Sequence, residues 1–369
     1  MKAWLLLFLA LQFIGTTSAQ SSGVLLGVAD SITTQRDYDD FGRISPPAYR
    51  TLWIARDVNG ELTVLATLPE LVVPRKDGFW RVGVSQNCIF DDSVKDFPNE
   101  SLLQEVWAAP IGKTATMEQS QPCALHKPED YAPPYGRSEE DKGKISQCGF
   151  ALASIHYLSP EMIGISVEEG SSEACEAGRG GRVTEKYSVR NFDYRALGFG
   201  QLLGPAARDA YFDALPKHGT NSFGTECGDP SKDDDTGWRV EHKLGSWHPY
   251  LNQSLGYFEC TADRPIHFQL PAPVTGDLST PLDWKLLRSR IIGISDAYAS
   301  PNGDMLIAIT KSEIRVFEAR RRIPGKLLLK LSAGEIVMAQ WATGAHVPDW
   351  TTELSNLAKQ RLPESIRTK

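Results

Sequence analysis

Histidines and large aromatic residues gather most densely in one short stretch, between positions 238 and 250. The stretch contains Trp238, His242, Trp247, His248 and Tyr250. Such side chains combine apolar faces with polar tips, and when exposed they stack on sugar rings or anchor a protein partner. We therefore predict a binding site at these five residues. The alternative is that they are core residues beside a hairpin, and the spacing of the two histidines matches no particular metal geometry.

The sequence contains no recognised pattern for nucleophilic, metal-dependent or phosphate chemistry. Ser166 and Ser295 each follow a glycine two residues earlier, as in the G-x-S-x-G turn of serine hydrolases, but both lack the closing glycine. We interpret both serines as ordinary strand positions. The acidic run over residues 229–237 lacks the glycine and glutamate of an EF-hand loop, so we interpret it as a solvated turn. We predict no catalytic residue, no metal and no cofactor.

The N-terminus has the pattern of a secretory signal peptide. Lys2 precedes an apolar run from Trp4 to Ile14, and small residues lead to a cleavage position after Ala19. The run is shorter than the roughly 20 apolar residues that a spanning helix needs. We expect a secreted or periplasmic protein with a signal at residues 1–19 and no membrane span after cleavage.

The charge of the chain argues against two classes of partner. The formal net charge is -7, which gives no electrostatic reason to expect binding to nucleic acid or to an anionic membrane. The short basic run Arg320–Arg322 lies between strand candidates, and we interpret it as a solvated turn.

The cysteines indicate disulfide bonds. An exported chain with an even number of cysteines is expected to form them, and the chain has six: Cys88, Cys123, Cys148, Cys175, Cys227 and Cys260. Fifteen pairings are open, of which pairing of sequence neighbours is our working expectation. No cysteine follows Cys260, so we expect the last hundred or so residues to be held together by packing alone.

The elements that must position any site are mostly strands. We expect a β-rich unit at 20–118, a polar loop at 119–145, a disulfide-stapled α+β unit at 146–280, and a β meander with a terminal helix at 281–369. In the first unit a polar leader precedes four strands over 51–85, and the spacing of its apolar residues predicts a helix at Asn99–Ala109. The second has an alternating strand at 163–168 and a helix from Pro205. In the last, Thr280 and Asp349 are expected to cap helices.

The fold class that these elements favour is α+β and β-rich, with antiparallel sheets and a few short helices. An all-β propeller is the alternative. The segment from Tyr298 to Ala319 resembles one propeller blade, in which an S-P-x-G turn opens a strand. A propeller repeats that unit several times, and the centre of this chain shows no echo of it.

A second resemblance lies in the middle of the chain. Its residues are Ile165–Glu169, the glycines of 178–181, Asn191–Asp193 and Gln201–Leu203. This succession of strand, glycine-rich segment, strand and helix resembles the extracytoplasmic domain of bacterial lysozyme-sensing anti-sigma factors and related secreted envelope proteins. The resemblance covers about 50 residues and implies an α+β fold that binds a protein or glycan. It assigns no functional residue, and no transmembrane segment joins it to a sigma-binding part.

Three functions are compatible with the sequence. We favour an exported bacterial envelope protein with a non-catalytic module that binds a protein or glycan. A cleft with clustered acids, or a buried Ser–His contact, would contradict that hypothesis. The second is a secreted hydrolase acting on a cell-wall or glycan substrate, whose Asp and Glu residues meet only in three dimensions. The third is a propeller scaffold.

Overall fold

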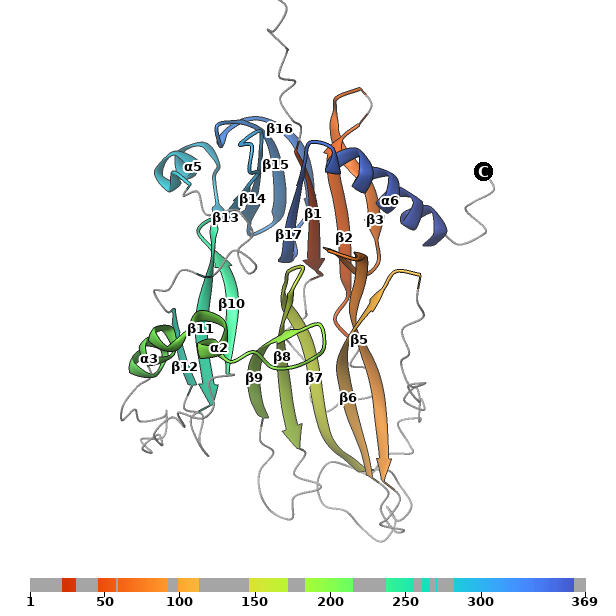
Figure 1. The fold of residues 1–369 in the computed structure, drawn as a ribbon, viewed down its shortest axis with the longest axis vertical. Helices are drawn as coiled ribbons and strands as arrows, with labels where there is room; N and C mark the ends of the chain where they lie inside the picture. Colours follow the sequence, from red (N-terminus) through yellow and green to blue (C-terminus); the bar gives the residue numbers. More distant parts are fainter. Residues whose placement is uncertain are drawn as a thin grey trace, which may run out of the picture.

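Strands predominate in the structure, and the helices are few and short (Figure 1). The computed structural model describes residues 22–30, 46–57, 59–91, 99–112, 146–171, 183–214, 237–254, 261–265, 270 and 282–361. The predicted β-rich fold with antiparallel sheets is confirmed. The expected signal peptide, the polar loop at 119–145 and the acidic run at 229–237 lie outside or almost wholly outside these ranges.

The strands form four sheets. The first has the order β17-β1-β2-β3 and contains β1 (Ser22–Ala29), β2 (Tyr49–Arg56), β3 (Leu62–Leu68) and β17 (Glu335–Thr343). The second follows sequence order through β4 (Leu71–Arg75), β5 (Gly78–Asp91), β6 (Asn99–Pro110), β7 (Ser146–Leu158), β8 (Met162–Ser171) and β9 (Val183–Asn191). The third contains β10 (Trp238–Lys243), β11 (Ser246–Ser254) and β12 (Thr261–Pro265). The fourth contains β13 (Ile294–Ala299), β14 (Met305–Thr310), β15 (Glu313–Arg320) and β16 (Ile323–Ser332).

Strand β1 lies where the sequence had predicted a polar leader, and that prediction is wrong. All eight of its residues are buried. It pairs antiparallel with β2 on one side and with β17 on the other. A strand covered on both faces reads as a continuous apolar run rather than as an alternation. The first and last strands of the described chain thus share a sheet.

Strand β6 replaces the helix predicted at Asn99–Ala109, so that prediction is also wrong. Its residues pair antiparallel with β5 from Trp80↔Pro110 to Asp91↔Asn99. Its first residues pair in parallel with β7, from Asn99↔Ser146 to Leu103↔Ala151. The spacing of the apolar residues suits a helix, but pairing along almost the whole of β5 favours the extended form. Strand pairing therefore joins residues on both sides of the 119–145 loop in one sheet.

Four helices complete the described fold: α2 (Phe199–Leu203), α3 (Pro205–Ala214), α5 (Trp284–Arg290) and α6 (His346–Arg361). The helix predicted from Pro205 is confirmed. The cap of α5 is Asp283 rather than Thr280, because the Asp283 carboxylate accepts a hydrogen bond from the Leu286 N–H at 3.0 Å. Helix α6 begins at His346, and Asp349 lies in its first turn instead of preceding it.

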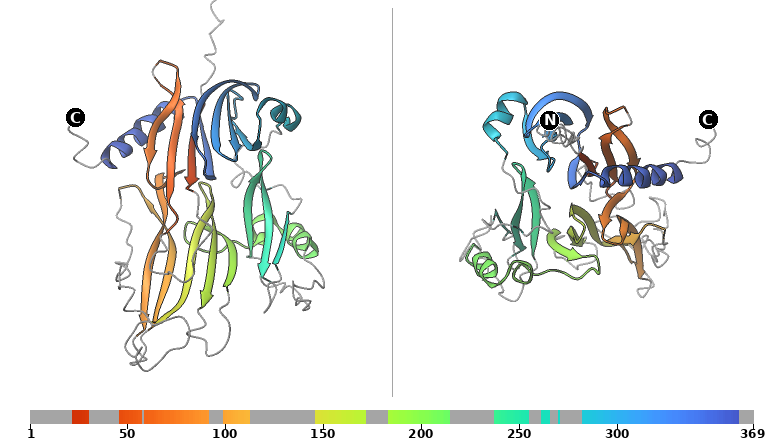
Figure 2. Two further views of the ribbon diagram at one scale, coloured as in Figure 1. Left: turned by 180° about the vertical axis from the view of Figure 1, so that it is seen from behind. Right: turned by 45° about the horizontal axis from the view of Figure 1, so that its top comes forward.

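One apolar cluster joins all four sheets. Val24 of β1, Tyr157 of β7, Trp238 of β10 and Tyr298 of β13 all belong to it. In the right-hand view of Figure 2 the sheets lie around a common centre. A second cluster packs the first two sheets against α6, and a third packs α5 against the fourth sheet. The centre of the molecule is therefore a place where residues distant in sequence meet.

The arrangement shares two features with the propeller alternative. Four sheets surround one centre, and the two ends of the described chain meet in one sheet. The six-stranded sheet, with its parallel β6–β7 pair, differs from the four-stranded meander β13–β16. The described sheets are therefore not repeats of one uniform blade.

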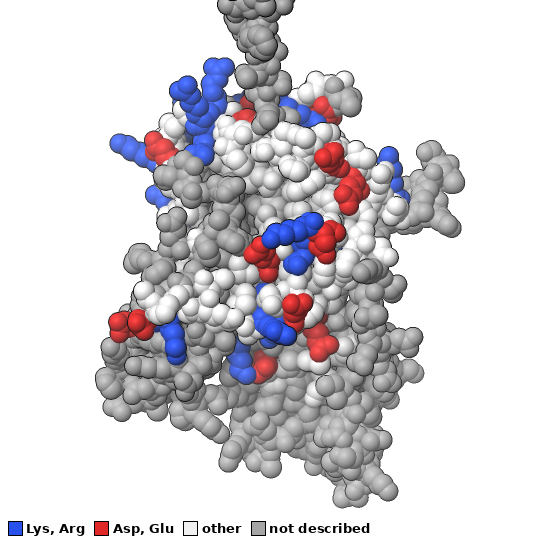
Figure 3. Space-filling view, in the orientation of Figure 1, with Lys and Arg blue, Asp and Glu red and all other residues white. Residues whose placement is uncertain are grey.

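The coloured part of the surface in Figure 3 carries charges of both signs, and basic side chains gather at its upper left. Arg288 and Arg290 lie in the last turn of α5. Arg321 and Arg322 form the turn between β15 and β16 with positive φ angles of 52° and 66°. The turn predicted at these arginines is confirmed. Among the described residues no helix is both long and apolar enough to cross a bilayer.

We predict that Leu26→Ala strongly destabilises the protein, because Leu26 is fully buried in β1 within the central cluster. Removing a buried leucine side chain costs about 2–5 kcal/mol of unfolding free energy. Urea unfolding would measure the loss. The control is Leu327→Ala in β16, where the side chain is 37% exposed and we expect a loss below about 1 kcal/mol. Equal losses in the two variants would contradict the structural role of β1.

Candidate functional site

A cavity of about 370 Å³ lies where the four sheets meet. Residues of β7, β9, β10, β11, β13, β14 and β17 contribute to its wall. Its polar and charged lining comprises His156, Tyr187, Arg239, Glu241, His242, Lys243, Asp296, Tyr298 and Glu335, and Trp247 adds an aromatic face. Such a concentration of titratable groups in one cavity is typical of a functional site.

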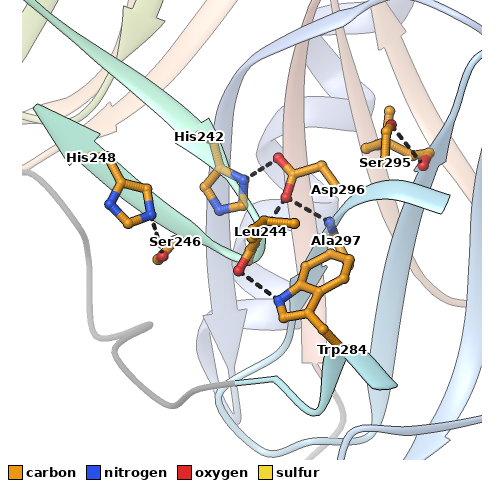
Figure 4. A network of polar contacts seen from close by, with 10 residues as sticks. His242, Leu244, Ser246, His248, Trp284, Ser295, Asp296 and Ala297 are labelled. Atoms are coloured by element: carbon orange, nitrogen blue, oxygen red, sulfur yellow. Dashed lines mark hydrogen bonds and ion pairs between the residues drawn. The ribbon is translucent and has the colours of Figure 1, made fainter. Parts of the chain in front are cut away.

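A histidine and an aspartate form the best ordered polar contact in the cavity (Figure 4). His242 Nδ1 lies 2.5 Å from Asp296 Oδ2. The side chains are 4% and 14% exposed, so little water competes for the contact. A carboxylate at Nδ1 fixes the imidazole tautomer that carries its proton there and leaves Nε2 as the acceptor. Nε2 has no hydrogen-bond partner within the described ranges.

The Asp296 carboxylate is itself held by the backbone. Its Oδ1 accepts hydrogen bonds from the Gly245 N–H at 2.9 Å and from the Ala297 N–H at 2.8 Å. Gly245 and Leu244 form the β10–β11 turn with positive φ angles of 78° and 50°, the conformation that a two-residue hairpin requires. The Leu244 carbonyl accepts a hydrogen bond from Trp284 Nε1 at 2.8 Å, which ties the turn to α5 (Figure 4). The third and fourth sheets thus fix the carboxylate together.

Aromatic rings hold the imidazole in place. The His242 ring stacks on Tyr298, with centroids 3.8 Å apart and planes 13° from parallel. Trp247 meets the same imidazole edge-on at 4.8 Å. Burial, with the negative charges of Asp296 and Glu335, raises the pKa of Tyr298 well above its usual value. The phenol therefore stays protonated, and the imidazole has one defined orientation.

A row of alternating charges follows the other side of β10. Glu241 Oε1 lies 2.6 Å from Arg239 Nε, and Glu241 Oε2 lies 2.6 Å from Lys243 Nζ. These residues share one face because side chains alternate along a strand. Burial acts to raise the pKa of Glu241, but the hydrogen bonds from Lys243 and Arg239 outweigh it and hold the pKa below its usual value. Glu241 therefore remains ionised.

The pKa of Glu335, at the start of β17, is shifted in the opposite direction. Its side chain reaches solvent at the rim of the cavity. Its carboxyl is nevertheless enclosed enough that desolvation raises its pKa, and the negative charge of Glu241 raises it further. Two carboxyl groups in one cavity whose pKa values are driven apart are the usual arrangement of an acid and a carboxylate with different roles.

His156 is a buried base without a hydrogen-bond partner in the described structure. It occupies the β-bulge between Ile155 and Tyr157 in β7, and bulges of this kind redirect a side chain. Its ring lies over Gly164, where an added Cβ would come within 2.7 Å of Nε2. Both ring nitrogens are buried and unpaired in the described structure. Desolvation, with the nearby positive charge of Arg239, lowers its pKa to about 3 although Glu241 acts against the shift.

Of the five site residues predicted from the aromatic stretch, two line the cavity and three do not. His242 and Trp247 line the cavity. Trp238 is fully buried, and its Nε1 donates to the Leu197 carbonyl at 2.8 Å, so it is a core residue. Tyr250 is buried beneath the Lys243 ammonium, which lies 4.3 Å from the ring centroid. His248 is not in the cavity wall, and its Nε2 contacts Ser246 Oγ at 2.8 Å.

Sequence reasoning missed most of the charged residues of the cavity. The missed residues are His156, Arg239, Glu241, Lys243, Asp296 and Glu335. The alternating charges of β10 could have been recognised from the sequence, because they lie within the predicted stretch at 238–250. Asp296 and Glu335 come from strands far along the chain and carry no local pattern. Both serines considered above do occupy strands: Ser166 contacts Ser154 Oγ at 2.6 Å, and Ser295 donates to the Ile309 carbonyl at 3.1 Å.

Several predicted features lie beyond what the structure describes. The possible calcium ligands of 229–237, the glycines of 178–181 and four of the six cysteines are outside the described residues, and the side chains of Cys88 and Cys148 are not described. Disulfide pairing therefore stays a prediction. Within the described ranges no group of three or more His, Cys, Asp or Glu residues is placed to hold a metal ion.

Comparison with known proteins gives no family. No protein-family model matches the chain, and no curated protein matches it significantly. Function is therefore inferred from the chemistry of the cavity. That cavity gathers the carboxyl groups of Glu241, Asp296 and Glu335, and the choice between a binding module and a hydrolase stays a prediction.

We predict that His156 makes the protein less stable in mild acid. The unfolded chain takes up a proton near pH 6.5, whereas the folded pKa is about 3, so the unfolded state binds more protons between these values. Stability should fall by about 1.4 kcal/mol per pH unit below 6.5 from this residue, or about 2 kcal/mol by pH 5. Urea unfolding between pH 5 and 8 would measure it.

The variant His156→Gln should remove this part of the pH dependence. The matched control is His346→Gln, at the exposed start of α6, which should retain the wild-type slope. A wild-type slope in His156→Gln would show that other groups cause the acid sensitivity.

Proposed function

We propose that this protein binds a short saccharide in the central cavity. The observation that carries the proposal is the combination, in one cavity, of aromatic rings with charged groups of both signs. Aromatic faces cover the apolar side of a sugar ring, and carboxylates and cationic groups supply acceptors and donors for its hydroxyls. Of the protein or glycan ligand favoured from the sequence, these features support the glycan.

The balance of charge supports an uncharged ligand. Arg239 and Lys243 are both engaged by Glu241, and Asp296 is engaged by His242. A cavity whose charges already neutralise one another gives little net attraction to a strongly charged ligand. A polyol with many donors and acceptors can instead add hydrogen bonds to groups whose positions are already fixed.

The size of the cavity supports a small ligand rather than a protein surface. Its volume is about 370 Å³, near the lower end of the roughly 300–1,000 Å³ that small-molecule sites occupy. Tyr187 is half-buried, and Arg239 lies 4.6 Å from the centroid of its ring. The ring and the cation together form a wall against which a flat sugar face can pack.

We predict that Glu241→Gln weakens saccharide binding by about ten- to a hundredfold, because a hydrogen bond to a charged group contributes about 1.5–3 kcal/mol. Isothermal titration calorimetry with cellobiose, maltose, chitobiose and the peptidoglycan disaccharide would measure the affinity. The amide keeps one oxygen that accepts from one of the two cations and turns its NH2 toward the other, so the melting temperature of the variant is measured beside its affinity.

The matched control is Glu313→Gln. Glu313 has the same kind of partners on the surface, with Arg315 Nε at 2.8 Å and Lys330 Nζ at 3.5 Å, but it does not line the cavity. Its affinity should equal that of the wild type. An absence of binding heat for every member of the panel would overturn the proposed function.

A further inference from the structure

We propose that the cavity hydrolyses a glycosidic bond of the saccharide it binds, with His242 activating a water molecule and Glu335 donating a proton to the leaving oxygen. This inference rests on the proposed saccharide binding and adds a chemical step to it. It is carried by the position of these two side chains in one cavity.

Water is the attacking group in the proposed step. The described residues that line it include no serine, threonine or cysteine, so an acyl or glycosyl intermediate on such a side chain has no candidate there. A water molecule needs a base to become a sufficient nucleophile, and a positioned side chain supplies it.

His242 has the surroundings of such a base. Asp296 holds its Nδ1 at 2.5 Å and is held in turn by the backbone N–H groups of Gly245 and Ala297. The stacked Tyr298 ring prevents the imidazole from turning away. In Figure 4 the second ring nitrogen points away from Asp296. A carboxylate in this position also stabilises the imidazolium that forms when Nε2 takes a proton.

Glu335 has the surroundings of an acid. It lies at the rim, where desolvation and the charge of Glu241 raise its pKa, so a larger fraction is protonated than for an ordinary glutamic acid. Glu241 itself stays ionised between its two cationic partners. Its negative charge is suited to stabilise the positive charge that develops at the anomeric carbon.

The step balances in atoms and charge. Glu335 gives its proton to the glycosidic oxygen as the bond from the anomeric carbon to that oxygen breaks, and the electron pair stays on the oxygen. The water oxygen forms a bond to the anomeric carbon while His242 Nε2 removes one of its protons. The products are a reducing sugar and an alcohol, and proton exchange with solvent restores both side chains.

The arrangement of the cationic side chains favours a glycosidic bond over an ester as the bond that is hydrolysed. Ester hydrolysis builds a negative charge on the carbonyl oxygen and needs donors aimed at it. The two cationic side chains of the cavity, Arg239 and Lys243, are already bound to Glu241 at 2.6 Å each. Two carboxyl groups with opposite pKa shifts are instead the pattern of glycoside hydrolysis.

The experiment uses each disaccharide that binds in calorimetry, together with its 4-nitrophenyl glycoside and with 4-nitrophenyl acetate as the ester probe. We expect the full-length protein to release reducing sugar. His242→Asn and Glu335→Gln should each lower kcat/KM by about 100-fold or more. The control variants are His346→Asn and Glu353→Gln, both on α6 and outside the cavity. Burial also raises the pKa of Glu353, so this control shares the desolvation of Glu335 without the neighbouring charge of Glu241.

Two further readouts separate chemical roles from structural ones. Activity of the wild type should fall on the alkaline side as Glu335 loses its proton, and Glu335→Gln should remove that alkaline limb. Asp296 acts as a positioning residue, so Asp296→Asn should lower kcat while leaving KM nearly unchanged. Direct attack by water predicts inversion at the anomeric carbon, which proton NMR of the first product would show.

Each outcome decides between the proposals. A disaccharide that binds yet is recovered intact overturns the hydrolytic inference and leaves the binding function standing. No binding by any disaccharide overturns both. Retention of anomeric configuration, or full activity in His242→Asn, overturns the role given to His242. Turnover of the ester alone overturns the choice of bond.

Discussion

The pairing of β1 with β17 is the constraint on which the central cavity depends. It brings the two ends of the described chain into one sheet, from Ser22↔Thr343 to Ala29↔Glu335. Because Glu335 is the last residue in that register, the pairing also places its carboxyl at the edge of the cavity. A ladder of backbone hydrogen bonds across more than three hundred residues of sequence makes the site conditional on the whole fold. Loss of β1 would remove a side of the first sheet and the support of β17 together.

The cavity shows how interactions with partners offset the free-energy cost of burying charged groups. An isolated ionised group in a protein interior costs several kcal/mol, and here Arg239, Lys243, Glu241 and Asp296 each have a polar or oppositely charged partner. Arg239 and Lys243 share Glu241, and Asp296 has His242 and two backbone donors. His156 meets the same requirement by remaining neutral, which is why its pKa is low.

The sequence predicted the composition of the fold better than the location of the site. Strands with one wet face, such as β8, and the short meander of β13 to β16 follow from local alternation and turn residues. Strand β1 was missed because it is buried on both faces and does not alternate, and β6 because its spacing also fits a helix. Of the predicted site, only His242 and Trp247 reach the cavity. Trp238 alternates with polar residues in sequence, whereas Tyr250 lies between Pro249 and Leu251. Sheet packing decides which face is buried, and one sequence does not reveal the sheet that covers it.

The two glutamates at the centre of similar ion pairs show why residue type and spacing alone did not identify the site. Glu313 binds Arg315 and Lys330, as Glu241 binds Arg239 and Lys243, and both glutamates have lowered pKa values. For Glu313 the hydrogen bond from Arg315 is the main cause of the lowered pKa. For Glu241 burial opposes the shift, and the same cavity holds a second carboxyl and a histidine–aspartate pair. The difference is that Glu241 lies in a cavity. There less water screens the charges, so each charge shifts the pKa of its neighbours more strongly. The convergence of four sheets therefore distinguishes the cavity cluster from a surface salt bridge, because it brings several charged side chains together.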